Sequence, residues 1–230
     1  MKKGILLSVA SMLVFSVAAM AIPITVVTGT WTNPWGEHNN ADGITIYGSS
    51  TNSTVSWGVG TQYPTNQSSY NWTSADTTDL DVSIGTVFSL GTFTHNNFEI
   101  TTTSNALKTV KLDFAIGEFD SAQILSTAFD FFHNETTNTG AGCCDDIVEV
   151  NPVLNAGFSY LGEDYFFSLL GFSRNNGLTI STEFITEEGK SNHAELYAII
   201  TATPIPEPAS LVIFGTGLGL LGLAAWRKKK

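Results

Sequence analysis

The chain has 230 residues, and charged side chains make up only 13% of it. Six of the 10 basic residues lie near the two ends of the sequence, so residues 22–208 hold the other 4 together with all 21 acidic residues, a net charge of −17. Such a charge repels phosphate backbones and excludes nucleic acid as a partner, and it leaves divalent cations, neutral glycans or water as companions of the surface.

The first 21 residues have the three parts of an export signal. Lys2 and Lys3 are followed by an apolar run and then by Ala19-Met20-Ala21, the small-residue pattern at which a signal peptidase cleaves. We therefore predict a signal helix over residues 1–21, cleaved after Ala21. An uncleaved membrane anchor is the alternative, and the shortness of the apolar run disfavours it.

The next segment, residues 22–203, alternates apolar and polar residues with the period of two that half-buried strands show. Val110, Leu112, Phe114 and Ile116 form one apolar face, and residues 194–201 alternate in the same way. Further strands are predicted at Thr25–Thr32, Gly43–Tyr47, Thr54–Gly58, Val87–Thr94, Ala128–His133, Ile147–Val150, Phe158–Leu161, Tyr165–Phe172 and Leu178–Ile185, with turns at 41–43, 174–177 and 187–189. Many short strands predict one all-β domain, an antiparallel β-sandwich of jelly-roll or immunoglobulin-like kind.

Several local strings of this segment resemble one family when they are taken together. They are Thr28-Gly29-Thr30-Trp31, Ser56-Trp57-Gly58, Phe88–Phe98 with its Leu-Gly-Thr-Phe-Thr-His-Asn-Asn core, Cys144–Val148 and Gly189–Ala198. This set resembles the choice-of-anchor K domain, a bacterial surface module that is coupled to interchangeable C-terminal anchors. The resemblance implies surface display and no known catalysis. The doubled cysteine is a departure from it.

Cys143 and Cys144 are adjacent and are the only cysteines of the chain. Export places them in an oxidising compartment. They can form a vicinal disulfide, bond another molecule or stay free. A catalytic thiol would need a paired base, and nothing in the sequence marks His133 as one.

Acidic and histidine residues offer two kinds of metal site. Calcium prefers oxygen ligands from loops, so Asp145 and Asp146 are the candidate calcium ligands, with a solvated acidic loop as the alternative. The four histidines have no i,i+4 or alternate-strand spacing, which argues against zinc; they are His38, His95, His133 and His193. The polar side chains of residues 94–97 are expected to bond backbone groups within a turn.

Four tryptophans of the segment could stack on sugar rings if they were exposed, although at least two are expected in the core. They are Trp31, Trp35, Trp57 and Trp72. The sequence contains no glycine-rich phosphate loop, nucleophile elbow or metalloprotease motif. We therefore expect no enzyme and no required cofactor, with calcium as the one candidate.

The C-terminus combines three features in a fixed order. Pro206-Glu207-Pro208 precedes an uncharged apolar stretch over residues 209–226, which as a helix would rise about 27 Å and cross a bilayer core. Trp226 then marks the interface, and four basic residues keep the tail in the cytoplasm; they are Arg227, Lys228, Lys229 and Lys230. The alternatives fit less well: the Leu-Pro-x-Thr-Gly of a sortase signal is missing, and a glycolipid-anchor signal would end in its apolar tail.

This arrangement over residues 204–230 resembles the PEP-CTERM sorting domain. The resemblance implies handling by an exosortase, a membrane-embedded cysteine transpeptidase of Gram-negative bacteria that make extracellular polysaccharide. We therefore expect a protein that is anchored in the inner membrane with its body outside the cytoplasm and then reaches the surface or the medium, with extracellular polysaccharide as a partner. A glycan- or calcium-binding, lectin-like surface module is the alternative function, and a plain single-pass anchor is the alternative for the C-terminus.

Overall fold

The computed structural model describes residues 21–60, 66–76, 80–101, 104–117, 123–136, 144–152 and 155–203. Every regular element in these ranges is a strand. The strands are β1 (Ala21–Ile24), β2 (Val26–Gly36), β3 (Thr45–Ser49), β4 (Asn52–Trp57), β5 (Ser68–Ser74), β6 (Leu80–Ser83), β7 (Val87–Asn97), β8 (Leu107–Gly117), β9 (Gln123–Asn134), β10 (Asp146–Val150), β11 (Ala156–Tyr160), β12 (Glu163–Ser173), β13 (Glu183–Thr186) and β14 (Lys190–Thr201).

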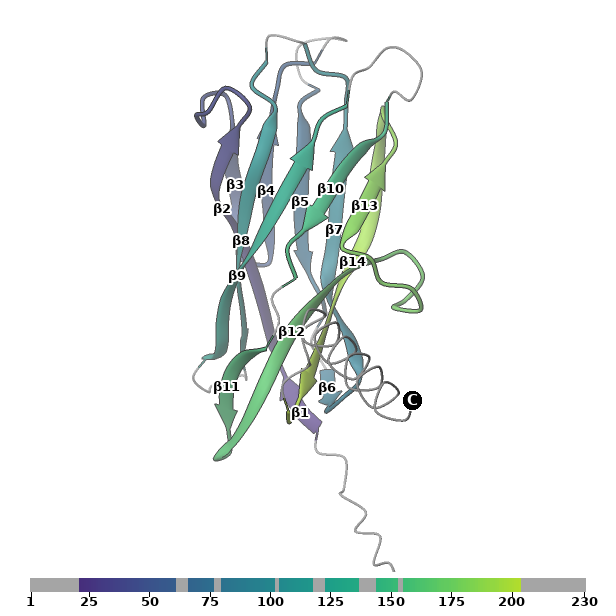
Figure 1. Cartoon of the computed structure of the whole chain (residues 1–230). Helices are drawn as coiled ribbons and strands as arrows, with labels where there is room; N and C mark the ends of the chain where they lie inside the picture. The colour runs from purple at the N-terminus through teal and green to yellow at the C-terminus, as the bar shows by residue number, and fades with distance from the viewer. Residues whose placement is uncertain are drawn as a thin grey trace, which may run out of the picture.

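The strands form two facing sheets and a small third one (Figure 1). The five-stranded sheet has the order β13-β10-β9-β8-β2, and the seven-stranded sheet has the order β11-β12-β14-β7-β5-β4-β3. β1 and β6 pair with each other. All of these pairings are antiparallel. The predicted antiparallel β-sandwich is therefore confirmed.

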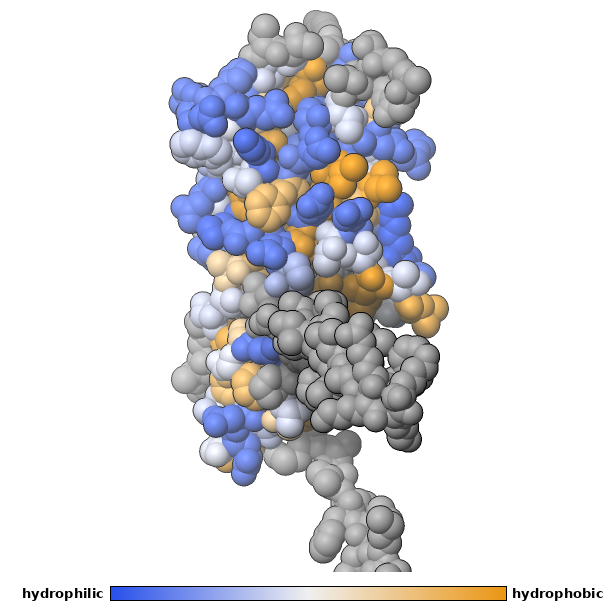
Figure 2. Space-filling view, viewed as in Figure 1, coloured by the Kyte–Doolittle hydropathy of each residue, from blue (hydrophilic) through white to orange (hydrophobic). Residues whose placement is uncertain are grey.

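The period-two pattern places the predicted apolar face of β8 in the core. Val110, Leu112, Phe114 and Ile116 are buried, and Asp113 on the opposite face is exposed. The turns predicted at 41–43, 174–177 and 187–189 are also present. On its outer side the five-stranded sheet is mostly hydrophilic, with separate apolar side chains between the polar ones (Figure 2).

The strand predicted at Leu178–Ile185 is wrong over its first half. β13 covers only Glu183–Thr186, and Leu178 is 86% exposed. The preceding turn extends further than its sequence signal, because the Asn175 side-chain oxygen accepts a hydrogen bond from the Thr179 amide at 3.0 Å. An asparagine that bonds backbone in this way holds the chain in a turn and delays the next strand.

Aromatic rings fill the space between the sheets. Phe129 lies nearly parallel to Phe167, with ring centroids 6.2 Å apart, and its ring is 5.0 Å from that of Phe114. One layer further along, Phe93 and Phe131 stack at 5.6 Å. Each such side chain contributes about 1.5–3 kcal/mol through burial, so these layers hold the two sheets together.

Both ends of the described chain lie at the same end of the sandwich (Figure 1). β1 pairs with β6, and the amide of Gly85 just after β6 donates to the carbonyl of Ile200 near the end of β14. At the opposite end of the seven-stranded sheet, Lys190 at the start of β14 pairs with Asn97 at the end of β7. We call this opposite end the distal end.

The predicted signal helix over residues 1–21 lies outside the described residues except for Ala21, the first residue of β1, and the predicted transmembrane helix over residues 209–226 lies wholly outside them, so both stay predictions. Within the described ranges, no helix has the length and apolar character needed to span a membrane.

Candidate functional site

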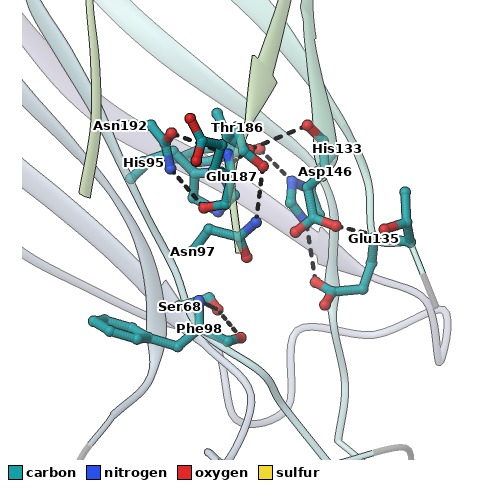
Figure 3. A network of polar contacts seen from close by, with 12 residues as sticks. Ser68, His95, Asn97, Phe98, His133, Glu135, Asp146, Thr186, Glu187 and Asn192 are labelled. Atoms are coloured by element: carbon teal, nitrogen blue, oxygen red, sulfur yellow. Dashed lines mark hydrogen bonds and ion pairs between the residues drawn. The ribbon is translucent and has the colours of Figure 1, made fainter. Parts of the chain in front are cut away.

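The filling of the core changes from phenylalanine to histidine toward the distal end. On β9, Phe129, Phe131 and His133 are all buried, and on β7 the same change occurs between Phe93 and His95. The two imidazole rings come from opposite sheets and meet edge to face at 5.2 Å. We call the polar side chains around them the buried polar cluster; it consists of His95, Asn97, His133, Glu135, Asp146 and Thr186 (Figure 3).

His95 has a defined tautomer within this cluster. Its Nδ1 lies 2.8 Å from Thr186 Oγ1, and that hydroxyl donates its hydrogen to the backbone carbonyl of Asp146 at 3.1 Å. Because a hydroxyl has only one hydrogen to donate, Thr186 must accept the other bond from His95 Nδ1–H. The Nε2 lone pair of His95 therefore points into the cluster, where it is buried and has no hydrogen-bond partner among the described residues.

His133 links an aromatic hydroxyl to two carboxylates. Its Nδ1 lies 2.6 Å from the Tyr70 hydroxyl, and its Nε2 lies 3.1 Å from Glu135 and 3.7 Å from Asp146. Burial lowers the pKa of His133 to about 4, although Asp146 opposes that shift. Burial also raises the pKa of Tyr70, so its hydroxyl keeps its proton. His133 is thus neutral at physiological pH.

The carboxylates of this region have raised pKa values. Burial raises the pKa of Asp146 to about 6 and that of Glu135 to about 7. Glu188, beside them in space, also has its pKa raised to about 7, by burial first and then by the charge of Asp146. Within the described residues, the ion pairs of Glu135 and Asp146 are made with His133 and with no lysine or arginine.

Four members of the region present oxygens that make no hydrogen bond of normal geometry within the described part of the chain. They are Asn97 Oδ1, Glu135 Oε1, Asp146 Oδ2 and both carboxylate oxygens of Glu188. Two of these carboxylates nevertheless have a donor nearby, the Trp57 indole for Glu135 and the Gly189 amide for Glu188, and each donor lowers the pKa of its carboxylate. The second oxygen of Asp146 is satisfied, because it accepts the Thr136 amide at 2.8 Å. A buried acceptor without a partner costs about 1–3 kcal/mol, so a group of them at one place requires an explanation.

Two sequence predictions about these residues are wrong. Asp145 and Asp146 were expected to act together in a calcium loop, but Asp146 begins β10 and points into the core while Asp145 is exposed. Neighbouring residues of an extended strand face opposite sides. Residues 94–97 were expected in a turn, and they are part of β7 instead, where His95 and Asn97 reach Thr186 in another strand.

The histidine spacing argued against a zinc site, and the fold nevertheless brings two of the histidines together with an aspartate. His95, His133 and Asp146 each present one ligand atom, and these atoms lie within 4.8 Å of one another. They come from β7, β9 and β10, and only strand pairing brings them together. A signal for them was present in the sequence: each is a polar residue in phase with buried apolar residues two positions away, such as Phe93, Phe131 and Val148.

Three of the four tryptophans lie in the core, so stacking on sugars through them is wrong. Trp31 and Trp72 are buried, and Trp57 stacks on the His95 ring at 5.6 Å, where it closes one side of the buried polar cluster. Trp35 alone of the four is exposed, at 46%.

Cys144 is disulfide-bonded. Cys143 falls outside the described residues, so the vicinal pairing stays a prediction. Ala21 is the first residue of β1, while Ala19 also falls outside the described ranges, and cleavage between the signal and the body stays a prediction as well.

The surface has two shallow neighbouring pockets that share Arg174. Their volumes are about 300 and 180 Å³, and the larger contains Glu183 while the smaller contains His193 and Glu195. The guanidinium of Arg174 packs 4.4 Å above the Phe184 ring and donates to the carbonyl of Ile185 at 2.7 Å. These pockets are open, whereas the buried polar cluster is enclosed.

The last part of the chain shows how the protein is handled. Residues 204–230 match the PEP-CTERM protein-sorting motif. This motif marks an exported surface protein that an exosortase targets, and it implies anchoring in the membrane before processing. No curated protein matches the chain. The sorting residues predicted from sequence, Pro206, Glu207 and Pro208, lie inside the matched range.

Proposed function

We propose that this protein is a non-catalytic display module of the choice-of-anchor K kind, which an exosortase processes at Pro206-Glu207-Pro208 and which then associates with extracellular polysaccharide. The position of the sorting motif carries the proposal. The matched residues 204–230 follow β14, whose last residue is Thr201, so almost no linker separates the sandwich from its anchor. The anchored body therefore stands with its distal end away from the membrane.

The placement of the ionisable side chains supports a role without catalysis. His95, His133 and Asp146 form the group of titratable residues that most resembles catalytic machinery, and all three are buried between the sheets. A polymer substrate would have to reach these atoms directly for general acid or base catalysis. The enclosed position of the cluster favours a structural role instead.

The surface supports association with polysaccharide. The body is acidic, charged side chains are sparse, and the strands contain many serine, threonine and asparagine residues. Neutral hydroxyl and amide groups of this kind exchange hydrogen bonds with sugar hydroxyls. The open pockets around Arg174 and the exposed ring of Trp35 offer further contacts for a glycan chain.

Processing is tested with the full chain in an exosortase-containing host and in the same host without exosortase. Intact mass of the membrane and released fractions is the measurement. We expect the wild-type chain to lose its C-terminal segment only when exosortase is present. The triple variant Pro206→Ala, Glu207→Ala, Pro208→Ala should remain at full mass in the membrane, while Pro204→Ala, a matched proline replacement outside the tripeptide, should still be processed.

Three results would contradict the proposal. A mature protein that keeps its full C-terminus in the exosortase host would remove the processing step. Equal sedimentation of the protein with cell surfaces that have and that lack the polysaccharide would remove the association. The appearance of new reducing ends when purified protein is added to that polysaccharide would show that the module is a hydrolase, against the non-catalytic role.

A further inference from the structure

We propose that the buried polar cluster is a structural site for one divalent metal ion of the zinc class, held by His95 Nε2, His133 Nε2 and an Asp146 carboxylate oxygen. Glu135 is placed to supply the fourth ligand. The site would join β7 of the seven-stranded sheet to β9 and β10 of the five-stranded sheet at the distal end of the sandwich. It is independent of the exosortase processing proposed above.

The directions of the donor atoms in the cluster support a metal ion. His95 directs an unprotonated Nε2 into the cluster because Thr186 accepts its Nδ1–H, and Asp146 Oδ2 and Glu135 Oε1 are buried there without hydrogen bonds of normal geometry among the described residues. Metal ligands need free lone pairs of this kind. Trp57 Nε1 and the Thr136 hydroxyl are buried donors near Glu135 and Asp146, so the free lone pair that carries the proposal is that of His95 Nε2.

The carboxylates of the cluster also support a metal ion. Glu135 and Asp146 lie 3.1 and 3.7 Å from His133 Nε2, and within the described residues neither carboxylate forms an ion pair with a lysine or arginine. Buried carboxylates are found either paired with cations or coordinated to metals. A divalent ion placed between the histidines would supply the missing positive charge.

The side chains that hydrogen-bond the two histidines support a metal ion as well. A metal-binding histidine almost always donates its other ring N–H to an oxygen, which fixes the orientation of the ring. Thr186 already has this role for His95. The Tyr70 hydroxyl oxygen lies 2.6 Å from His133 Nδ1 and can accept a hydrogen bond from an Nδ1–H group. His133 Nε2 would then be free to bind the ion, which would replace the proton that Nε2 shares with Glu135.

The donor atoms favour zinc over calcium. Calcium takes six to eight oxygen ligands, whereas two imidazole nitrogens with one or two carboxylates suit zinc and its neighbours among the transition metals. Tetrahedral zinc holds its ligand atoms about 3.3 Å apart. The ligand atoms here lie within 4.8 Å of one another, so they need to close in by at most about 1.5 Å on binding.

The experiment uses the full chain, purified in detergent without chelator from a zinc-replete culture, and measures metal content by elemental mass spectrometry. We expect close to one zinc ion per chain. After removal with a chelator, Zn²⁺ should rebind with the same stoichiometry by calorimetry, and Co²⁺ should give the visible absorption of a tetrahedral site. Ca²⁺ should not compete.

Variants locate the ion. Asp146→Asn and His95→Gln should abolish stoichiometric binding, and Thr186→Val should weaken it about 10–100-fold because it removes the partner of the His95 ring. His193→Gln is the matched control, since His193 lies on β14 and bonds Thr94 on the exposed side of the sheet. This control should bind zinc like the wild type.

Several outcomes would overturn the proposal. They are a wild-type chain that neither contains zinc nor binds it after chelator treatment, full zinc binding by folded His95→Gln, and binding of Ca²⁺ in preference to Zn²⁺. If the ligand variants fail to fold, the Co²⁺ spectrum of the wild type still tests the site. It must show nitrogen and oxygen ligands in tetrahedral geometry. An octahedral spectrum with oxygen ligands alone would exclude the site.

Discussion

The two ends of the sandwich solve the same packing problem with opposite chemistry. At the end that holds the chain termini, Phe114, Phe129 and Phe167 fill the space between the sheets with stacked rings. At the distal end, the same two sheets enclose His95 and His133. The first region needs nothing beyond its own side chains, because apolar burial is stabilising by itself.

The distal region is different, because its buried atoms are stable only when each finds a partner. Low dielectric strengthens every hydrogen bond that is made there and makes each unmade one costly. The structure leaves several carboxylate oxygens and one imidazole nitrogen of this region without such bonds within its described residues. The phenylalanine layers therefore hold the sheets together without a partner, whereas the distal end has unpaired buried acceptors, for which we propose a metal ion.

Phe129→Ala is the largest perturbation that we expect on the apolar side. The side chain is fully buried between Phe114 and Phe167, so its truncation removes transfer free energy and leaves a cavity. The free energy of unfolding should fall by about 3–5 kcal/mol. Urea denaturation should give the same loss of unfolding free energy with added zinc and with chelator. A loss that depends on zinc would show that the apolar region and the distal region are not independent.

Removal of zinc should be the corresponding perturbation of the distal end. An ion that binds only the folded chain stabilises it by about 4 kcal/mol when its concentration is 1,000 times the dissociation constant. Chelator should therefore lower the unfolding temperature of the wild type but not that of Asp146→Asn. Equal shifts in both proteins would place the stabilising ion elsewhere.

Tyr70→Phe tests the distal region at one atom. The change keeps the ring, which packs against Trp31, Trp57 and Phe93, and removes only the hydroxyl that bonds His133. Because a buried imidazole nitrogen then loses its partner, unfolding should become easier by about 1–3 kcal/mol. Thermal unfolding beside wild type is the measurement, and an unchanged midpoint would show that the hydroxyl is dispensable.

The apolar region could be predicted from the sequence because its signal is local. Val110, Leu112, Phe114 and Ile116 repeat every second residue, and that repeat identifies a buried strand face without any knowledge of its partners. Fold class and most strand positions follow from such runs. Topology does not, since alternation says nothing about which strand lies beside which.

The distal region could not be predicted in this way, because its residues are brought together only by strand register. His133 lies opposite Val148 in the β9–β10 pairing, and Asp146 starts the same β10 strand. Adjacency in the sequence was misleading, since Asp145 and Asp146 face opposite sides. A useful rule follows for similar chains: histidine or aspartate at an inward position of a strand is a site candidate even without motif spacing.

The smallest effect should come from Asp130→Asn, which calibrates the other three. Asp130 lies on β9 between Phe129 and Phe131 but on the outer face, where its carboxylate meets Lys111 at 2.6 Å and both side chains are about two-fifths exposed. Exposed ion pairs contribute about 0–1 kcal/mol, because water competes with them and salt screens them. The midpoint of urea denaturation should hardly move, with or without zinc. A loss as large as that of Tyr70→Phe would mean that an outward-facing residue of β9 matters as much for stability as a buried one. The contrast between the two ends of the sandwich, which rests on buried side chains, would then have no physical basis.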